Sequence, residues 1–293
     1  MAKKRVLITG GSGFIGKNLV ELLGGKYSIS APGRRELDLA NAGQVEFFLK
    51  QNQFDAVVHA ASAVLYGGAA GKGGAGASLE MFRNIARCSS HFGKLIQLGS
   101  GAEYDKSRPL VRVREEEFGK ALPQDEYGRY KYECSKIIEA EKNMVCLRLF
   151  GCFGKYEDYS SRFISNAICK SLFGLPVTIA NKNVVFSYLY IDDFVRVLEH
   201  FIESEARHKS YNVVPDGTAD LLSIARMVNG ISGSKLPIAV KNPGMGNEYS
   251  GDNSRLRREL PDFRFTPMEQ SLRELYGWYE KNRGAIDAKR LGD

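Results

Sequence analysis

The chain has 293 residues, of which 43% are hydrophobic and 26% charged, a composition that excludes a disordered, collagen-like or disulfide-stabilised chain. Basic residues outnumber acidic ones by 41 to 34, but they are spread along the chain without a run or motif typical of nucleic-acid binding. There is no membrane-spanning apolar run, no signal-peptide cleavage site and no CxxC pair. We therefore expect a cytoplasmic protein with reduced thiols, no nucleic-acid or membrane partner, and a small anionic ligand.

Short apolar segments alternate with segments of helical spacing through the first half of the chain. We expect strands at 5–9, 27–30, 56–60, 94–98 and 144–148. We expect helices at 17–23, 44–51, 79–88 and 127–142. This alternation predicts an α/β fold, a doubly wound parallel sheet of the Rossmann type with helices on both faces.

The pattern is less regular after residue 151. We expect helices at 163–173, 192–202, 221–229 and 268–282, strands at 188–191 and 211–214, and a loop between the last two helices. This content predicts a small C-terminal substrate-binding lobe over the carboxyl edge of the sheet, where ligands bind in such folds. The predicted division is a Rossmann domain, 1–154 with 183–214, and a lobe, 155–182 with 215–293.

The segment 67–77 consists almost entirely of glycine and alanine, apart from one lysine. We interpret it as a surface loop, since such composition is common in loops. A lid that closes over a substrate is the alternative.

A glycine-rich turn with the spacing G-x-x-G-x-x-G, at Gly10, Gly13 and Gly16, follows the first strand and opens the first helix. Gly10 makes the tight turn, Gly13 lets the backbone approach a pyrophosphate, and Gly16 lets the helix pack close to the sheet. The helix N-terminus at Phe14 and Ile15 presents N–H groups and a partial positive charge to phosphates. This context predicts a dinucleotide cofactor.

The residues after the second strand indicate which dinucleotide binds. An acidic residue there holds the ribose 2′-hydroxyl of NAD, whereas arginine accommodates the 2′-phosphate of NADP. The chain has Arg34 and Arg35, which favour NADP, followed by Glu36, which keeps NAD as an alternative.

Tyr127 and Lys131 lie four residues apart on an expected helix and therefore share a face. A lysine ammonium lowers the pKa of a nearby phenol, which makes the tyrosine usable as a general acid near neutral pH. Tyr132 and Lys136 have the same spacing, but five residues rotate a helix by about 140°, so only one pair fits one site. Asp125 marks the helix start just before Tyr127 and favours the first pair.

Ser100 follows an expected strand at the carboxyl edge of the sheet. A hydroxyl there can donate a hydrogen bond to a substrate carbonyl or alkoxide beside Tyr127. We therefore predict Ser100, Tyr127 and Lys131 as the catalytic residues. The histidines have no metal-ligand spacing, so no metal is expected, and His59 is interpreted as a packed strand residue.

These motifs resemble the extended short-chain dehydrogenase/reductase family, in its branch of nucleotide-sugar reductases and epimerases. The matching stretches extend over residues 5–214 and include the glycine turn, 59–61, 127–131, 147–150 and 190–193. The resemblance implies that Lys131 holds the nicotinamide ribose beside Tyr127. It also implies a homodimer built on the Tyr127 helix and its neighbour. The cofactor cleft would be lined by Asp38 and Leu39, which flank the adenine, and by Ala60 and Ala61.

The stretch 34–39 is similar to GDP-fucose synthase-like 4-keto-sugar reductases, which use NADPH. Epimerising members use a Cys and a His where this chain has Ala102 and Arg162, and neither replaces those proton donors well, since arginine stays protonated. Dehydrating members carry Asp-Glu after the catalytic Ser or Thr, where this chain has Gly101 and Ala102. The resemblance therefore implies reduction without C3/C5 epimerisation or dehydration.

The leading hypothesis is NADP-dependent reduction of a nucleotide-linked 4-keto-6-deoxy sugar. The alternatives are an NAD-dependent C4 epimerase of a nucleotide sugar and a non-catalytic nucleotide sensor. Because arginine supplies paired donors to a diphosphate, we expect substrate contacts from Arg162, Arg255 and Arg257. A solvated charged stretch at 254–258 is the alternative for the last two.

Overall fold

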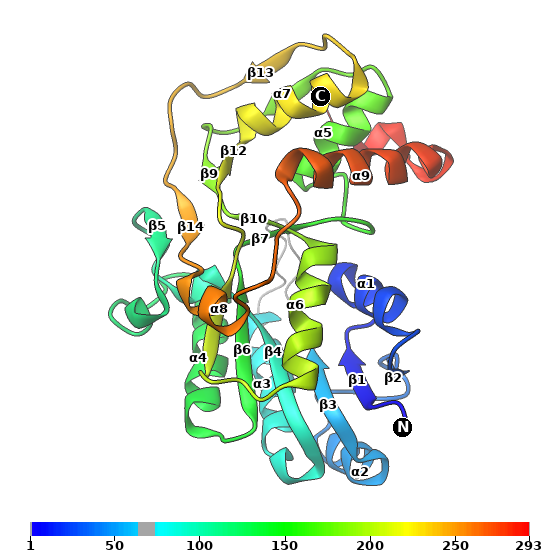
Figure 1. Cartoon of the computed structure of the whole chain (residues 1–293), viewed down its shortest axis with the longest axis vertical. Helices are drawn as coiled ribbons and strands as arrows, with labels where there is room; N and C mark the ends of the chain where they lie inside the picture. Colours follow the sequence, from blue (N-terminus) through cyan, green and yellow to red (C-terminus); the bar gives the residue numbers. More distant parts are fainter. Residues whose placement is uncertain (1, 64–73, 293) are drawn as a thin grey trace.

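A six-stranded parallel sheet is the centre of the protein, in a computed structural model that describes residues 2–63 and 74–292 (Figure 1). The strand order is β11-β6-β4-β3-β1-β2. The strands are β1 (Arg5–Thr9), β2 (Ser28–Ser30), β3 (Phe54–His59), β4 (Phe92–Ser100), β6 (Met144–Leu149) and β11 (Ser210–Val213). The order reverses between β1 and β3, and ligands bind at the carboxyl ends of strands at such a point.

Helices cover both faces of this sheet, which is why its strands are almost continuously apolar. On β1, Val6 and Ile8 belong to one core cluster and Leu7 to the other, and all are buried. The first cluster includes α1 (Phe14–Leu23) and α6 (Ile191–Glu203). The second includes α2 (Ala42–Asn52), α3 (Gly74–Ala86) and α4 (Glu126–Ala140). The doubly wound α/β fold predicted from the sequence is therefore confirmed.

Smaller sheets and further helices lie beyond the carboxyl ends of the strands, in the upper part of Figure 1. One small sheet has the order β12-β9-β14-β5, from β5 (Leu110–Val113), β9 (Val185–Phe186), β12 (Ala219–Asp220) and β14 (Tyr249–Gly251). Two strand pairs accompany it, β7 (Gly151–Phe153) with β10 (Tyr188–Tyr190) and β8 (Val177–Ile179) with β13 (Ile238–Val240). The helices of this region are α5 (Phe163–Leu172), α7 (Leu221–Ser232) and α9 (Met268–Lys281), whereas α8 (Ser254–Glu259) packs against β11.

Two of the differences between the structure and the sequence-based expectation lie in the glycine-alanine segment and before α9. The helix expected at 79–88 begins at Gly74, so residues 74–77 of the glycine-alanine segment are its first turn rather than a loop or lid. The rest of that segment, 67–73, lies outside the described residues. The loop expected between 229 and 268 contains β13, β14 and α8, because short strands pair with distant segments and leave little local pattern. The predicted domain boundaries remain a prediction.

Of the helices that the structure describes, none has the length and apolar character needed to cross a membrane.

Candidate active site

The turn between β1 and α1 fits a pyrophosphate. Gly10 has a φ of +72°, which glycine adopts without strain, and a Cβ there would lie 2.8 Å from the backbone of Ala61. A Cβ at Gly16 would lie 2.1 Å from the Gly10 carbonyl oxygen, so only glycine allows α1 to pack on the turn. In the described part of the chain no side chain caps α1 at Gly13, so the first N–H groups of the helix remain available to phosphate oxygens.

The segment after β2 presents two cationic side chains to solvent. Arg34 and Arg35 are both exposed, and the Arg34 guanidinium lies 3.7 Å from the Asp38 carboxylate. The Glu36 carboxylate turns back and accepts a hydrogen bond from the Gly33 N–H at 2.8 Å. The acidic group is thus engaged within its own turn, whereas the arginines extend outward.

The other residues predicted to line the cofactor cleft lie along the same edge of the sheet. Leu39 is buried, and its carbonyl oxygen accepts a hydrogen bond from Asn84 at 2.8 Å. Ala60 and Ala61 directly follow β3, and Ala61 faces Gly10 across the turn.

Helix α4 begins where Asp125 caps it, because the Asp125 carboxylate accepts a hydrogen bond from the Gly128 N–H at 2.9 Å. This start puts Tyr127 in the first turn and Lys131 one turn further along the same face. The buried Lys131 Nζ donates to the Leu98 carbonyl oxygen of β4 at 2.5 Å. The arrangement ties the helix that carries Tyr127 to the central sheet.

Lys131 is charged and His59 is neutral in this environment. Burial by itself would lower the pKa of Lys131, but the nearby hydroxyl groups of Tyr130 and Tyr127 outweigh it and the pKa is raised. Burial, with a smaller contribution from the Lys131 charge, lowers the pKa of His59 to about 3. The His59 Nδ1 lies 2.8 Å from the Thr9 hydroxyl, the arrangement expected of a packed strand residue.

A cavity of about 380 Å³ opens at this edge, and both Ser100 and Tyr127 line it. The competing pair lies elsewhere: the Tyr132 ring is 4.7 Å from the Phe118 ring, and Lys136 pairs with Glu139 at 2.9 Å. Besides Ser100 and Tyr127, the cavity wall includes aromatic and cationic side chains, namely Phe150, Phe186, Tyr249, Lys106, Arg108 and Arg162. Aromatic faces suit a base or sugar ring, and cations suit phosphates.

Ser100 is held so that its hydroxyl can act on a bound molecule. Its Oγ accepts a hydrogen bond from the Ala102 N–H at 3.1 Å, and its own N–H donates to the Glu103 carboxylate at 2.9 Å. A hydroxyl carries one donor and two acceptor positions. The bond from Ala102 therefore leaves the hydroxyl proton for an oxygen in the cavity.

The structure brings only one of the three predicted substrate arginines to this cavity. Arg162 lines it, whereas Arg255 and Arg257 lie on α8 outside it. Arg255 is 2.5 Å from the Glu116 carboxylate, and Arg257 pairs with Asp216. These carboxylates engage both guanidinium groups. The expected substrate contacts of Arg255 and Arg257 stay a prediction, and so does the solvated stretch at 254–258.

Sequence reasoning missed other side chains of the cavity. Lys106 and Arg108 follow Ser100 closely, and this proximity was the signal that could have found them. Phe186 and Tyr249 reach the cavity from β9 and β14, whose pairing is not encoded by a local pattern. In the ranges 2–63 and 74–292, no group of three His, Cys, Asp or Glu side chains is arranged to hold a metal.

A Rossmann-type sheet with a glycine-rich first turn is the architecture of dinucleotide-binding proteins. Residues 6–214 match the NAD dependent epimerase/dehydratase family, and the chain belongs to that family. The resemblance to extended short-chain dehydrogenases/reductases is thereby confirmed.

Individual relatives support the same fold. A stretch of 62 residues, 21% of the chain, is 44% identical to a GDP-L-fucose synthase of Azorhizobium caulinodans. The chain spans only part of these curated relatives: the match covers 20% of the length of the GDP-L-fucose synthase and 48% of the length of a second relative. The GDP-mannoheptose C4 reductase of Campylobacter jejuni, solved with NADP bound, is 21% identical with a TM-score of 0.81, over 96% of this chain and 99% of that one. The UDP-glucose 4-epimerase of Thermotoga maritima, solved with UDP-glucose, is 19% identical with a TM-score of 0.81, over 95% and 99%.

Proposed function

We propose that the protein uses NADPH to reduce the keto group of a nucleotide-linked 4-keto-6-deoxy sugar. The observation that carries the proposal is the single cavity that contains Ser100 and Tyr127 together with cationic and aromatic side chains. Reductases with NADP bound are among the solved structures of similar fold. NADP rather than NAD is supported by the exposed Arg34 and Arg35 and by the engagement of Glu36 within its own turn.

The residues present fit this cofactor. The pyrophosphate would lie on the first turn of α1, the 2′-phosphate beside the arginines after β2, and the nicotinamide ribose beside Lys131. When bound, NADPH supplies the hydride of the reduction. The proposed cofactor-binding residues are Gly10, Gly13, Phe14, Ile15, Gly16, Arg34, Arg35, Asp38, Leu39, Ala60, Ala61, Tyr127 and Lys131.

The chain's own residues would supply binding and the proton. The Ser100 hydroxyl donates a hydrogen bond to the keto oxygen, and the Tyr127 phenol gives its proton to the same oxygen as the carbonyl becomes an alcohol. The Lys131 ammonium, held by the Leu98 carbonyl, stabilises the phenolate that remains. Arg162, with Lys106 and Arg108, would bind the diphosphate.

The test is NADPH oxidation by the purified protein against a panel of nucleotide 4-keto sugars, with the C4 configuration of the product read by NMR. We expect turnover with one of them, and a loss of kcat of about 10²–10⁴-fold in Tyr127→Phe. Tyr132→Phe makes the same chemical change outside the cavity and should keep wild-type kcat. Protein that purifies with stoichiometric NAD and interconverts C4 epimers without net NADPH oxidation would replace this proposal with the epimerase. A Tyr127→Phe variant that kept its biological role would favour the sensor.

The homodimer built on α4 and its neighbour, and the cytoplasmic location, remain predictions. Sedimentation of the purified protein would measure the former.

A further inference from the structure

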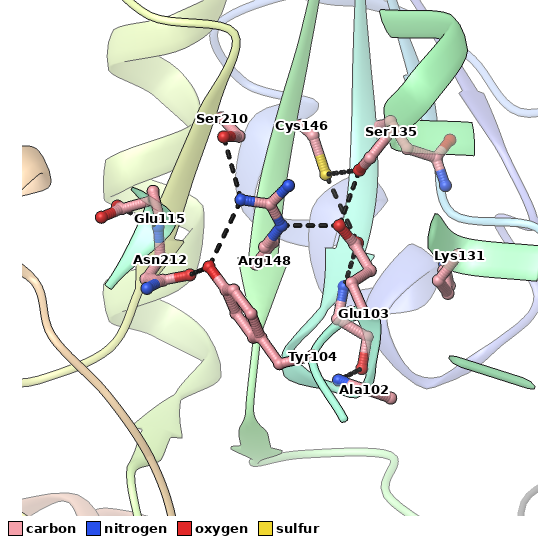
Figure 2. A network of polar contacts seen from close by, with 12 residues as sticks. Ala102, Glu103, Tyr104, Glu115, Lys131, Ser135, Cys146, Arg148, Ser210 and Asn212 are labelled. Carbon is pink, nitrogen blue, oxygen red and sulfur yellow. Dashed lines mark hydrogen bonds and ion pairs between the residues drawn. The ribbon is translucent and has the colours of Figure 1, made fainter. Parts of the chain in front are cut away.

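Behind Ser100, a network of buried polar side chains joins the turn after β4 to α4 and β6 (Figure 2). At its centre Glu103 is 0% exposed and Arg148 is 1% exposed, and the Arg148 Nε donates to Glu103 Oε2 at 2.6 Å. Burying two charges is costly unless both are paired and hydrogen-bonded. The contacts of these two groups therefore have to be nearly complete.

The Glu103 carboxylate touches both elements that carry the proposed catalytic groups. Its Oε1 accepts the Ser100 N–H at 2.9 Å, which fixes the start of the turn η2 (Gly101–Glu103). Its Oε2 accepts the Ser135 hydroxyl of α4 at 2.6 Å. Ser135 lies four residues after Lys131 and eight after Tyr127, so all three side chains share one face of the helix.

Arg148 is in turn held from its other side, as Figure 2 shows. Its Nη1 donates to the Ser210 hydroxyl at 2.9 Å and lies 3.4 Å from the Tyr104 hydroxyl. The Tyr104 hydroxyl donates to the Asn212 side-chain oxygen at 2.9 Å, and burial raises the pKa of Tyr104, which keeps it neutral. The guanidinium that faces Glu103 is therefore fixed by β11 and by the turn itself.

The packing leaves little room for the turn to shift against α4. A Cβ at Gly128 of α4 would lie 2.4 Å from the Ala102 carbonyl oxygen. A Cβ at Gly99 would lie 2.5 Å from Glu103 Oε1 and 2.3 Å from the Cys146 sulfur. The turn and the helix are thus in direct contact, with Glu103 bonded to both.

We propose that Glu103 is a positioning residue that sets the separation between the Ser100 hydroxyl and the Tyr127 phenol. The inference rests on the proposed function, in which these two groups act on one substrate oxygen. Glutamine in place of Glu103 presents an NH₂ group where the carboxylate accepts N–H or O–H donors on both oxygens. At least one of those donors then loses its acceptor, and the turn or the helix moves.

Two variants test the proposal by removing different parts of the network. Ser135→Ala removes the bond between Glu103 and α4, together with the 3.3 Å contact of the Ser135 hydroxyl with the Cys146 sulfur of β6, and keeps the ion pair with Arg148. Glu103→Gln removes the charge itself. Ser271→Ala on α9 is the matched control, since Ser271 is also a buried helical serine whose hydroxyl bonds a backbone carbonyl far from the cavity.

We expect Ser135→Ala to lower kcat by roughly tenfold or more, because misplacement of reacting groups reduces turnover more than binding. The KM of the nucleotide sugar and the Kd of NADPH should stay within about twofold of the wild-type values. Ser271→Ala should leave all three unchanged at a temperature where every variant is folded. A Ser135→Ala kcat within about twofold of wild type would overturn the proposal. So would a loss of kcat that Ser271→Ala reproduces.

Hydrogen exchange gives a measurement that does not depend on turnover. We expect either the Ser100 amide or the α4 amides around Ser135 to exchange at least roughly tenfold faster in Glu103→Gln, while the β1–α1 turn keeps its protection. Unchanged protection of both contradicts the proposal. If wild-type protein shows no turnover on the panel, the proposed function fails, and the exchange result still decides the role of Glu103. If Glu103→Gln does not fold, the exchange comparison is made on Ser135→Ala, in which the α4 amides around Ser135 should exchange faster because that helix loses its bond to Glu103; unchanged protection of these amides contradicts the proposal.

Discussion

Glu157 is a carboxyl group buried behind the wall of the cavity, with 7% of the residue exposed. Burial raises its pKa from 4.5 to about 7, although the Ser165 hydroxyl, which donates to it at 2.5 Å, and the Arg162 guanidinium, 3.8 Å away, both act in the opposite direction. Above neutral pH the folded protein therefore holds an anion whose lost hydration is only partly compensated. Glu157→Gln removes that anion and keeps an oxygen that accepts the Ser165 bond.

The magnitude follows from the pKa. At about 1.4 kcal/mol for each pKa unit, a rise from 4.5 to about 7 corresponds to roughly 3 kcal/mol of unfolding free energy. Because the folded state has the higher pKa, it binds the extra proton between these values, so this group's contribution to stability is fully present below about pH 4.5 and is lost as the pH rises through 7. We expect Glu157→Gln to exceed wild type by about 1–3 kcal/mol at pH 8, and the gain to vanish near pH 5.

Urea unfolding of both proteins from pH 5 to 8.5 measures this difference through the midpoint, with the slope m unchanged. Glu139→Gln is the control, since Glu139 forms an exposed ion pair with Lys136 and its loss should cost less than about 1 kcal/mol at any pH. A difference between Glu157→Gln and wild type that is independent of pH would refute the reasoning. A wild type that is the more stable protein at pH 8 would show instead that Arg162 fully compensates the buried charge.

Further changes test the cofactor turn and the substrate arginines. Gly16→Ala should weaken NADPH binding, measured by nucleotide fluorescence, by on the order of tenfold or more, because its Cβ would meet the backbone of the turn at 2.1 Å. Replacing Arg34 and Arg35 together by alanine should raise the Kd of NADPH by about tenfold and leave that of NADH unchanged. Arg162→Ala should raise the KM of the nucleotide sugar by about tenfold. Arg257→Ala should leave that KM unchanged, because Arg257 pairs with Asp216 outside the cavity.

The central sheet could be predicted because the sequence patterns that define its strands and helices are local. Most strands, such as β1, β3 and β6, are short and mainly apolar runs that are buried, and each helix has a core-facing stripe, so period and length separate them. One error falls where a small residue interrupts such a run: β4 continues through Gly99 to Ser100, past the strand end expected at Leu98. β5 could not be predicted, because its partner β14 lies about 140 residues away and supplies the hydrogen bonds that define it.

The candidate site was predictable to the same extent. Parallel strands end at one edge of a sheet, so a serine after β4 and a tyrosine at the start of α4 could be brought together by topology alone. No such rule predicts the position of an arginine side chain, since a guanidinium can pair with any carboxylate that lies close enough. The partners of Arg255 and Arg257 lie 139 and 41 residues away, and nothing near α8 in the sequence indicates them.

Glu103 shows why local pattern and catalytic geometry are separate problems. In the sequence it is an acidic residue in a turn, and such residues are almost never fully buried unless they are paired. Its partners Ser135 and Arg148 lie 32 and 45 residues further on, so it gains them only after β6 has joined β4 and α4 has packed on the sheet. The local sequence pattern therefore predicts that a serine and a tyrosine lie at the same edge of the sheet. Many different sequences meet that requirement. The exact distance between the two hydroxyl groups depends on a buried carboxylate with four donors. A single substitution there can move the groups while leaving every element of the fold in place.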